Sequence, residues 1–411
     1  MRNVVGARCV SCGTRAEAVP GLTVCPKCGG IMDIEYDYDY IRSHLTKEDL
    51  AQRNERSMWR YLEFLPVEKV GKPRLRVGAS PLYQADRLAK ALGLGEGKLY
   101  IKDDGQNPTA SLKDRASAMA VVKAGEAGMT EIACSSTGNA ASSLAGNAAV
   151  AGLTAYIFVP ARAPKGKVAQ LRMFGAHVVL VDGSYEDTFR ISAEAIDHFG
   201  WYNRNAAINP YLMEGKKTVS LEIAEQLGFK MTDYVAVSVG DGCTIAGVWK
   251  GFKDLYEAGF IDRLPRLISV QASGCCPINT AGAKRSFDWT PQEENTIADS
   301  IAVGVPRNPV KALKAISESD ALTVNVSDEE IYDAMKLLGR YAGVFAEPAG
   351  AAATAGIRKA VAEGLIEEGA SITTIVTGNG LKDVANAIKA AGEPVKIKPD
   401  MEELMNIMDR L

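Results

Sequence analysis

The chain has 411 residues, 47% hydrophobic and 24% charged, which is the ordinary balance of a globular protein with two or three domains. A formal net charge of −3 gives no basic surface for nucleic acid, so we expect no nucleic-acid partner. No apolar stretch approaches the roughly 20 residues that a membrane helix needs, and the first residues lack the apolar core of a signal peptide. We therefore expect a cytoplasmic protein with no membrane contact.

Two cysteine pairs stand near the N-terminus, in the pattern C-x2-C-x12-C-x2-C formed by Cys9, Cys12, Cys25 and Cys28. Two residues between thiolates let both sulfurs of a tight turn face one ion, and four thiolates complete a closed tetrahedral site. A pair of disulfides is the alternative, which a cytosolic location disfavours. The pattern predicts a structural metal ribbon over residues 1–34, with zinc expected and iron the minor alternative.

The remaining chain divides by composition into three segments. Residues 35–75 predict a helical connection that ends near Lys72 and Pro73, and residues 396–411 predict a C-terminal helix. Between them, over 76–395, short β-branched runs alternate with helix-length amphipathic segments, which predicts an α/β fold with parallel sheets covered on both faces. We expect a smaller domain, roughly 110–215, inserted in the larger one. The predicted strands are 131–135, 154–159, 177–181, 234–239, 266–270 and 372–376.

Ligands in such folds gather at the carboxyl ends of strands, and Lys113 opens a predicted helix in this region of the chain. The positive end of a helix dipole and burial both lower the pKa of an amine, which would make it a nucleophile for a Schiff base. Taken alone, a lysine beside Asp114 is more often part of a solvated ion pair. Only three histidines occur, none in a recognisable motif, so we expect lysine to transfer protons.

Two further loops each follow a strand and open a helix. Residues 135–140 offer hydroxyls and free N–H groups that suit a carboxylate, although plain capping of the helix is also possible. Residues 239–247 are glycine-rich, which lets backbone amides approach a phosphate, but they lack the Walker pattern. Asp241 is an awkward neighbour for a phosphate, so its carboxylate is expected to point away or to bond backbone amides.

Taken together, these motifs resemble the tryptophan-synthase-β-like (fold type II) pyridoxal-phosphate enzymes over about three quarters of the chain. The resemblance implies a two-domain α/β fold, here with a zinc-ribbon-like N-terminal extension. Leu112, where phenylalanine is frequent, together with Asp241 and Cys243, departs from the family pattern. The motifs are Asn-Pro-Thr at 107–109, Lys-Asp-Arg at 113–115, Ser-Thr-Gly-Asn at 136–139, Gly-Lys-Val-Ala-Gln at 166–170, Glu-Pro-Ala at 347–349 and Thr-Gly-Asn-Gly-Leu-Lys-Asp at 377–383.

The resemblance also implies a role for individual residues. Lys113 would carry pyridoxal 5′-phosphate and then move protons, Asn139 would hydrogen-bond the phenolic oxygen of the cofactor, and Thr377 would face its pyridine nitrogen. The loop that would hold the cofactor phosphate is Gly240, Asp241, Gly242, Cys243 and Thr244. The residues that would bind substrate are Ser136 and Thr137 for its carboxylate, and Lys167, Arg190 and Asn209, with Lys216 as a further candidate, for its phosphate.

Within the family, the motifs are most similar to those of the lyases that convert O-phospho-L-homoserine and water to L-threonine and phosphate. Some of these enzymes also carry a cysteine-paired N-terminal extension. The substrate implied is a small phosphorylated amino acid, and a homodimer is expected. The alternatives are a serine or threonine dehydratase, a phosphoserine-dependent β-replacement synthase of the same fold, and a zinc-ribbon binding module without enzymatic activity.

Overall fold

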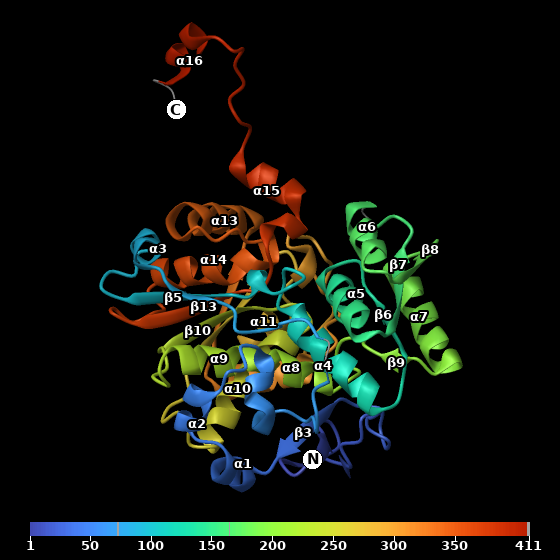
Figure 1. Cartoon of the computed structure of the whole chain (residues 1–411). Coiled ribbons are helices and arrows are strands. Elements are labelled where there is room, and N and C mark those ends of the chain that lie inside the picture. Colours follow the sequence, from blue (N-terminus) through green and yellow to red (C-terminus); the bar gives the residue numbers. More distant parts are fainter. Residues whose placement is uncertain (72–73, 164, 409–411) are drawn as a thin grey trace.

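The structure of the protein is a computed structural model that describes residues 1–71, 74–163 and 165–408. The predicted end of the helical connection, at Lys72 and Pro73, and the last three residues of the predicted C-terminal helix lie outside these ranges. The described chain forms three sheets: a six-stranded sheet, a four-stranded sheet and a small three-stranded ribbon. Figure 1 shows the ribbon beneath the larger domain, next to the N-terminus, and the four-stranded sheet to one side of it.

The six-stranded sheet has the order β12-β11-β10-β13-β5-β4, and all its neighbouring strands are parallel except the pair β4 and β5. Alternation along β10 explains the two layers of helices that cover it. Val235 and Val237 pack into one apolar core, whereas Tyr234 and Ala236 pack into the other. Its strands are β4 (Leu82–Gln84), β5 (Lys98–Asp103), β10 (Tyr234–Ser238), β11 (Arg266–Ala272), β12 (Leu322–Val326) and β13 (Ser371–Val376).

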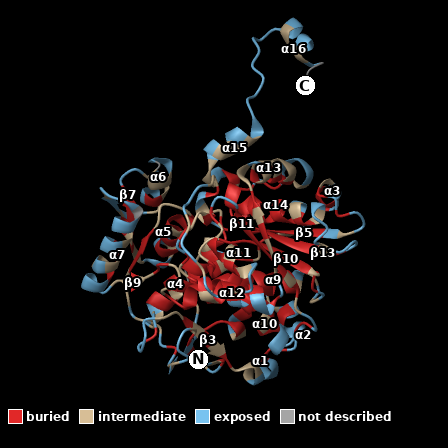
Figure 2. Ribbon diagram, turned by 180° about the vertical axis from the view of Figure 1, so that it is seen from behind, coloured by how far each residue is buried: buried red, intermediate tan, exposed pale blue. Residues whose placement is uncertain are grey.

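Helices cover both faces of this sheet, as the predicted α/β class requires (Figure 1). On one face lie α3 (Asp86–Ala91), α13 (Asp328–Ala342) and α14 (Pro348–Ala362). On the other lie α8 (Tyr211–Lys216), α9 (Thr218–Gln226), α10 (Cys243–Glu257), α11 (Pro277–Gly282) and α12 (Pro309–Glu318). Figure 2 shows that burial is concentrated in this sheet and the helices packed on it.

The four-stranded sheet is parallel, in the order β8-β7-β6-β9. Its core is rich in alanine, because α5 lies close against the strands through Ala141, Ala145 and Ala148. The division of the catalytic region at residues 110 and 215 stays a prediction. The elements here are β6 (Glu131–Ser135), β7 (Thr154–Pro160), β8 (His177–Val181), β9 (Tyr202–Asn203), α4 (Lys113–Glu126), α5 (Asn139–Ala151), α6 (Lys165–Met173) and α7 (Tyr185–Phe199).

The N-terminal ribbon is antiparallel and is anchored to the larger domain by ion pairs with two largely buried lysines. Asp33 of the ribbon lies 2.9 Å from the Lys250 amine and 3.0 Å from the Lys311 amine. Short helices follow between residues 38 and 64, within the predicted connection. The elements are β1 (Val4–Cys9), β2 (Arg15–Ala16), β3 (Met32–Tyr36), α1 (Tyr38–His44), α2 (Lys47–Gln52) and the 3-10 helix η1 (Met58–Phe64).

The chain ends in α15 (Val384–Ala391) and α16 (Met401–Met408), and the latter projects away from the body in Figure 1. Three short 3-10 helices complete the described elements: η2 (Asp104–Gln106), η3 (Asp299–Ile301) and η4 (Gly380–Lys382). All six predicted strands are present, and 131–135 and 177–181 have the predicted bounds. None of the helices in the described part of the chain combines the length and hydropathy that a membrane span requires.

A close helix crossing fixes the start of α4, the helix that begins at Lys113. A Cβ atom on Gly215 of α8 would lie 2.1 Å from the carbonyl oxygen of Arg115 and 3.1 Å from Cβ of Met119. Only glycine allows the two helices to approach this closely. The position of the first turn of α4 therefore depends on Gly215.

We predict that Gly215→Ala lowers the free energy of unfolding by about 1–3 kcal/mol, because the added methyl group collides with backbone that cannot move alone. The matched control is Gly125→Ala in α4, where the new Cβ meets nothing within 4 Å. That control should be neutral or stabilising by up to about 1 kcal/mol. Denaturant unfolding of both variants measures the difference, and equal effects would contradict the account.

Candidate active site

Lys113 lies at the carboxyl edge of β13, because its loop is paired with the loop that follows that strand. The N–H of Leu112 donates to the carbonyl of Thr377 (2.9 Å), and the N–H of Asn379 donates to the carbonyl of Ala110 (3.1 Å). Ala110 has a φ of +66°, a left-handed conformation that is rare outside glycine. The first predicted loop and the strand-end segment at 377–383 therefore form one structural unit.

The simpler interpretation of the sequence was an ion pair between Lys113 and Asp114, but the structure does not show this pair. Its buried carboxylate accepts hydrogen bonds from the N–H of Thr109 (2.8 Å), from the hydroxyl of Thr109 (2.9 Å) and from the amide of Asn147 (3.0 Å). Burial raises the pKa of Asp114 to about 6 despite these donors. Asp114 thus holds the Asn-Pro-Thr loop in shape, and Lys113 forms no ion pair within the described ranges.

Arg115 anchors the same turn from the opposite side. Its fully buried guanidinium donates to both carboxylate oxygens of Asp104 (2.7 and 2.8 Å) and to both of Glu222 (2.7 and 2.8 Å). The Lys102 amine, also buried, lies 2.7 Å from Glu222, and Ser80 donates to Asp104. Two cations and two carboxylates make this network neutral, so it fixes the turn without adding charge to the site.

The surroundings of Lys113 increase the fraction of its amine that is neutral and therefore nucleophilic. Loss of solvation, reinforced by the positive charges of Lys216 and Arg204, lowers the pKa of Lys113 from 10.5 to about 8. At pH 7 this corresponds to about 300 times more neutral amine than an unperturbed lysine would provide. A neutral amine is what Schiff-base formation with a carbonyl requires.

The second loop presents an open helix N-terminus. Gly138 is the N-cap of α5, and no side chain caps this helix, since the Ser136 hydroxyl accepts from the N–H of Gly138 (3.2 Å) instead. Among the described residues, the N–H groups of Thr137, Asn139 and Ala140 have no acceptor. This end of α5 can therefore hold an anion such as a carboxylate.

Asn139 is oriented by a residue to which sequence reasoning gave no role. Its side-chain amide donates to Oε1 of Glu347 (2.7 Å), and the N–H of Glu347 donates to the carbonyl of Gly378 (3.1 Å). Burial raises the pKa of Glu347 to about 7, so the neutral and charged forms of this carboxyl are both present near neutral pH. A Cβ on Gly378 would lie 2.1 Å from Glu347, so the glycine is needed for this contact. The Glu-Pro-Ala motif was the only signal for it in the sequence.

The third loop fits the phosphate of the expected cofactor. Within the described chain, the backbone N–H groups of residues 240 to 245 donate to no other group, and they stand at the N-terminus of α10. Asp241 binds backbone, as expected: its carboxylate accepts from the N–H of Arg307 (3.2 Å). Free amides at a helix N-terminus and an activated lysine are the groups that pyridoxal phosphate needs, so the residues present fit it.

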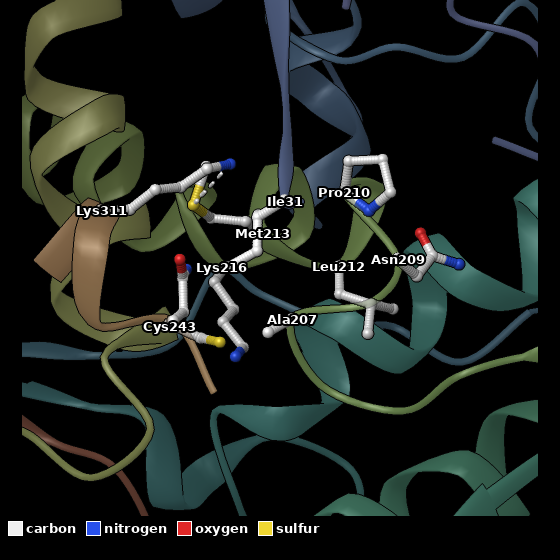
Figure 3. A pocket seen from close by; sticks show the side chains of 10 residues that line it. Ile31, Ala207, Asn209, Pro210, Leu212, Met213, Lys216, Cys243 and Lys311 are labelled. Carbon is white, nitrogen blue, oxygen red and sulfur yellow. Dashed lines mark hydrogen bonds between the residues drawn. The ribbon is translucent and has the colours of Figure 1, made fainter. Parts of the chain in front are cut away.

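The expected substrate-phosphate residues do not gather at one place. Lys167 lies 3.2 Å from Asp299 across the domains. Arg190 lies on α7 with its side chain 62% exposed and paired with Glu194 (2.9 Å), so the structure does not bring it to the loops around Lys113. The side-chain amide of Asn209 is already bonded to nearby backbone: it donates to the carbonyl of Asn203 (3.1 Å) and accepts from the N–H of Tyr211 (3.0 Å). Lys216, the further candidate, points toward Cys243 (Figure 3).

Lys382 belongs to the motif at 377–383, but the sequence alone suggested no role for it. Its amine donates to the hydroxyl of Ser142 (2.9 Å) and to the side chain of Gln170 (3.3 Å). Lys382 follows β13 of the larger sheet, whereas its partners lie on α5 and α6 beside the smaller one. It therefore links the two domains at the site.

The four N-terminal cysteines lie together as the sequence predicted. Their sulfur atoms are all within 4.8 Å of one another, and the Cys9–Cys28 and Cys12–Cys25 separations are 3.5 and 3.7 Å. No disulfide joins them. Zinc–sulfur bonds of about 2.3 Å in a tetrahedron place sulfurs about 3.8 Å apart, so the cluster fits a closed structural zinc site.

Comparisons with known proteins agree with this geometry. Residues 74–378 match the family model described as pyridoxal-phosphate dependent enzyme, so the chain belongs to that family. The chain is 41% identical to a protein named threonine synthase from Methanocaldococcus jannaschii, over 98% of this chain and 99% of the relative. It is 38% identical to the threonine synthase of Methanosarcina acetivorans, over 97% of each.

Similarity to solved structures supports the fold only, because the sequence identities are low. Threonine deaminase isoform 2 from Solanum lycopersicum superposes with a TM-score of 0.65 at 23% identity, covering 76% of this chain and 82% of that chain. Diaminopropionate ammonia lyase from Escherichia coli gives a TM-score of 0.65 at 20% identity, covering 78% and 88%. The two-domain, parallel-sheet architecture expected from the motifs is thereby confirmed.

We predict that the purified protein holds about one zinc ion per chain and that Cys25→Ser loses it, with a lower unfolding temperature, because three thiolates no longer close the tetrahedron. The control is Cys276→Ser, which lies outside the cluster. Elemental analysis and thermal unfolding measure both effects. Full metal content in Cys25→Ser would contradict the assignment.

The pKa of Lys113 predicts how the cofactor-free protein takes up a pyridoxal aldehyde. Because the reactive species is the neutral amine, the uptake rate should rise about tenfold per pH unit and level off near pH 8. Stopped-flow absorbance with unphosphorylated pyridoxal measures this without a titrating phosphate. A plateau that begins only near pH 10 would show an unperturbed lysine.

Proposed function

We propose that the protein is a threonine synthase, a lyase that converts O-phospho-L-homoserine and water to L-threonine and phosphate. The observation that carries the proposal is the activated Lys113, placed where three strand-end loops meet beside two open helix N-termini. Near full-length relatives named threonine synthase support the same activity, and the family supports the cofactor. A bound pyridoxal phosphate would supply the electron sink that makes the α and β protons of the substrate removable.

The residues of the chain divide the remaining work between them. We propose that the N–H groups of residues 240 to 244 hold the cofactor phosphate. Asn139, held by Glu347, would donate to the phenolic oxygen, and the Thr377 hydroxyl would face the pyridine nitrogen. Thr377 is partly buried at the end of β13, and a neutral partner there adds no charge to the ring.

Substrate binding would use the open end of α5. Ser136, Thr137 and the free N–H groups there would hold the α-carboxylate, which places the α carbon of the substrate toward Lys113. The Lys113 amine would then accept and return protons at the α and β carbons, since one flexible lysine reaches both. Loss of the γ-phosphate requires cations near the leaving group. We propose that Lys167 is one of them.

A dehydratase acting on serine or threonine, or a β-replacement synthase acting on phosphoserine, would use the same cofactor and carboxylate loops. Those activities lack support from the near full-length relatives, which are named threonine synthase. The resemblance to threonine deaminase is one of fold at 23% identity. The expected homodimer, the absence of nucleic-acid partners and the cytoplasmic location stay predictions.

We predict that the protein as purified absorbs as a pyridoxal imine and releases phosphate from O-phosphohomoserine with L-threonine as product. Lys113→Ala should lose both the absorption band and at least about 1000-fold in kcat, because no other group can carry the cofactor and move the proton. The matched control is Lys389→Gln, an exposed lysine on α15. Release of phosphate from phosphoserine but not from phosphohomoserine would contradict the proposed substrate.

A further inference from the structure

Two buried cations near Lys113 have no carboxylate partner among the described residues. Arg204 is 3% exposed and Lys216 is 4% exposed, and neither forms an ion pair within the described ranges. The other deeply buried cations behave differently: Lys102, Arg115 and Lys217 each contact at least one carboxylate. An uncompensated buried charge is costly, so a missing anion is the simplest account of these two side chains.

Arg204 follows β9 and reaches the helix of the active lysine. Its Nε donates to the hydroxyl of Ser117 (3.1 Å), which stands four residues after Lys113 and therefore on the same face of α4. The Nη2 atom of Arg204 is buried and has no hydrogen-bond partner. The guanidinium thus has an unused donor one helical turn from Lys113.

Lys216 approaches the same place from α8. Its Cβ lies close to α10, because a Cβ on Gly247 would be 3.2 Å away from it. Figure 3 shows its side chain running toward the sulfur of Cys243, the first residue of α10. The amine therefore stands at the end of α10 where the free N–H groups of residues 240 to 245 gather.

The charges around Cys243 are almost all positive. Lys113 interacts electrostatically with Lys216 and Arg204, and the carboxylate of Asp241, which acts on Lys113 in the opposite direction, accepts a hydrogen bond from the backbone N–H of Arg307. A dianion at this point would balance the positive charges of Arg204 and Lys216. A phosphate monoester has that charge and also accepts several hydrogen bonds from N–H groups.

We propose that Arg204 and Lys216 together bind one phosphate monoester dianion at the N-terminus of α10. The 5′-phosphate of the cofactor and the γ-phosphate of the substrate share this chemistry, and the second source rests on the proposed function. In either case the two residues bind and position the phosphate and are not themselves acid or base in the reaction.

The test separates the phosphate from the rest of each ligand. We expect Lys216→Gln and Arg204→Gln each to weaken pyridoxal phosphate about 10- to 100-fold in spectral titrations while leaving unphosphorylated pyridoxal unchanged. An unchanged cofactor affinity with a similar rise in KM for O-phosphohomoserine, and in the inhibition constant of inorganic phosphate, would support the substrate as the source. Lys389→Gln and Arg340→Gln, both exposed, are the matched controls.

Two results would overturn the proposal: no change in any of these constants, or equal losses for pyridoxal and pyridoxal phosphate, which indicates a general distortion. If a glutamine variant fails to fold, Lys216→Arg and Arg204→Lys retain the charge, and they should still bind pyridoxal phosphate more tightly than unphosphorylated pyridoxal. A phosphate-independent loss in these variants would again contradict the proposal. Failure of the proposed function is seen separately, as wild-type protein that binds cofactor but forms no threonine.

Discussion

The buried contact of Arg115 with Asp104 and Glu222 is the constraint on which the geometry of the site depends. It joins the end of β5 and the helix α9 to the first turn of α4, two residues after Lys113. Removing one partner would leave a buried charge unpaired, at a cost of about 3–5 kcal/mol. Backbone pairing with the loop after β13 holds the other side of the turn. Lys113 is therefore presented by a rigid support, while its own amine is free to react.

Buried charges that support the fold differ from those available to bind a ligand, because the supporting charges have partners of opposite sign. Lys217 contacts Glu214 and Asp254, and Lys250 contacts Glu214 and Asp33 of the N-terminal ribbon. Lys311, which also contacts Asp33, completes a cluster of three cations and three carboxylates. The preceding residue, Lys216, points instead to the glycine-rich loop and has no ion-pair partner among the described residues. One helical turn of α8 thus connects the ribbon to the site. Through this turn, a metal that stabilises the ribbon would also stabilise the catalytic region, although the metal lies outside the site.

The sequence was sufficient for the features that depend on local pattern. The run at 234–239 is rich in valine and contains no charged residue, so its burial as a central strand could be predicted. The spacing of the four cysteines was likewise enough to predict their cluster. β5 was missed because Lys102 and Asp103 interrupt its apolar pattern, and Lys102 is buried only with the help of Glu222, 120 residues away. The contact between Asn139 and Glu347 spans 208 residues, and although the Glu-Pro-Ala motif marked Glu347, nothing in the sequence paired it with Asn139. Arg190 was chosen by residue type, whereas its place on α7 decides that it faces solvent.

The central claim is that Lys113, and no other lysine, carries the cofactor. Hydride reduction of the cofactor-loaded protein fixes the pyridoxyl group on the amine that holds it, and mass spectrometry of the digested chain then locates the label. We predict a single labelled peptide with the modification on Lys113. A label on Lys216, on Lys382 or on any other lysine, or no label in protein that binds the cofactor, would contradict it.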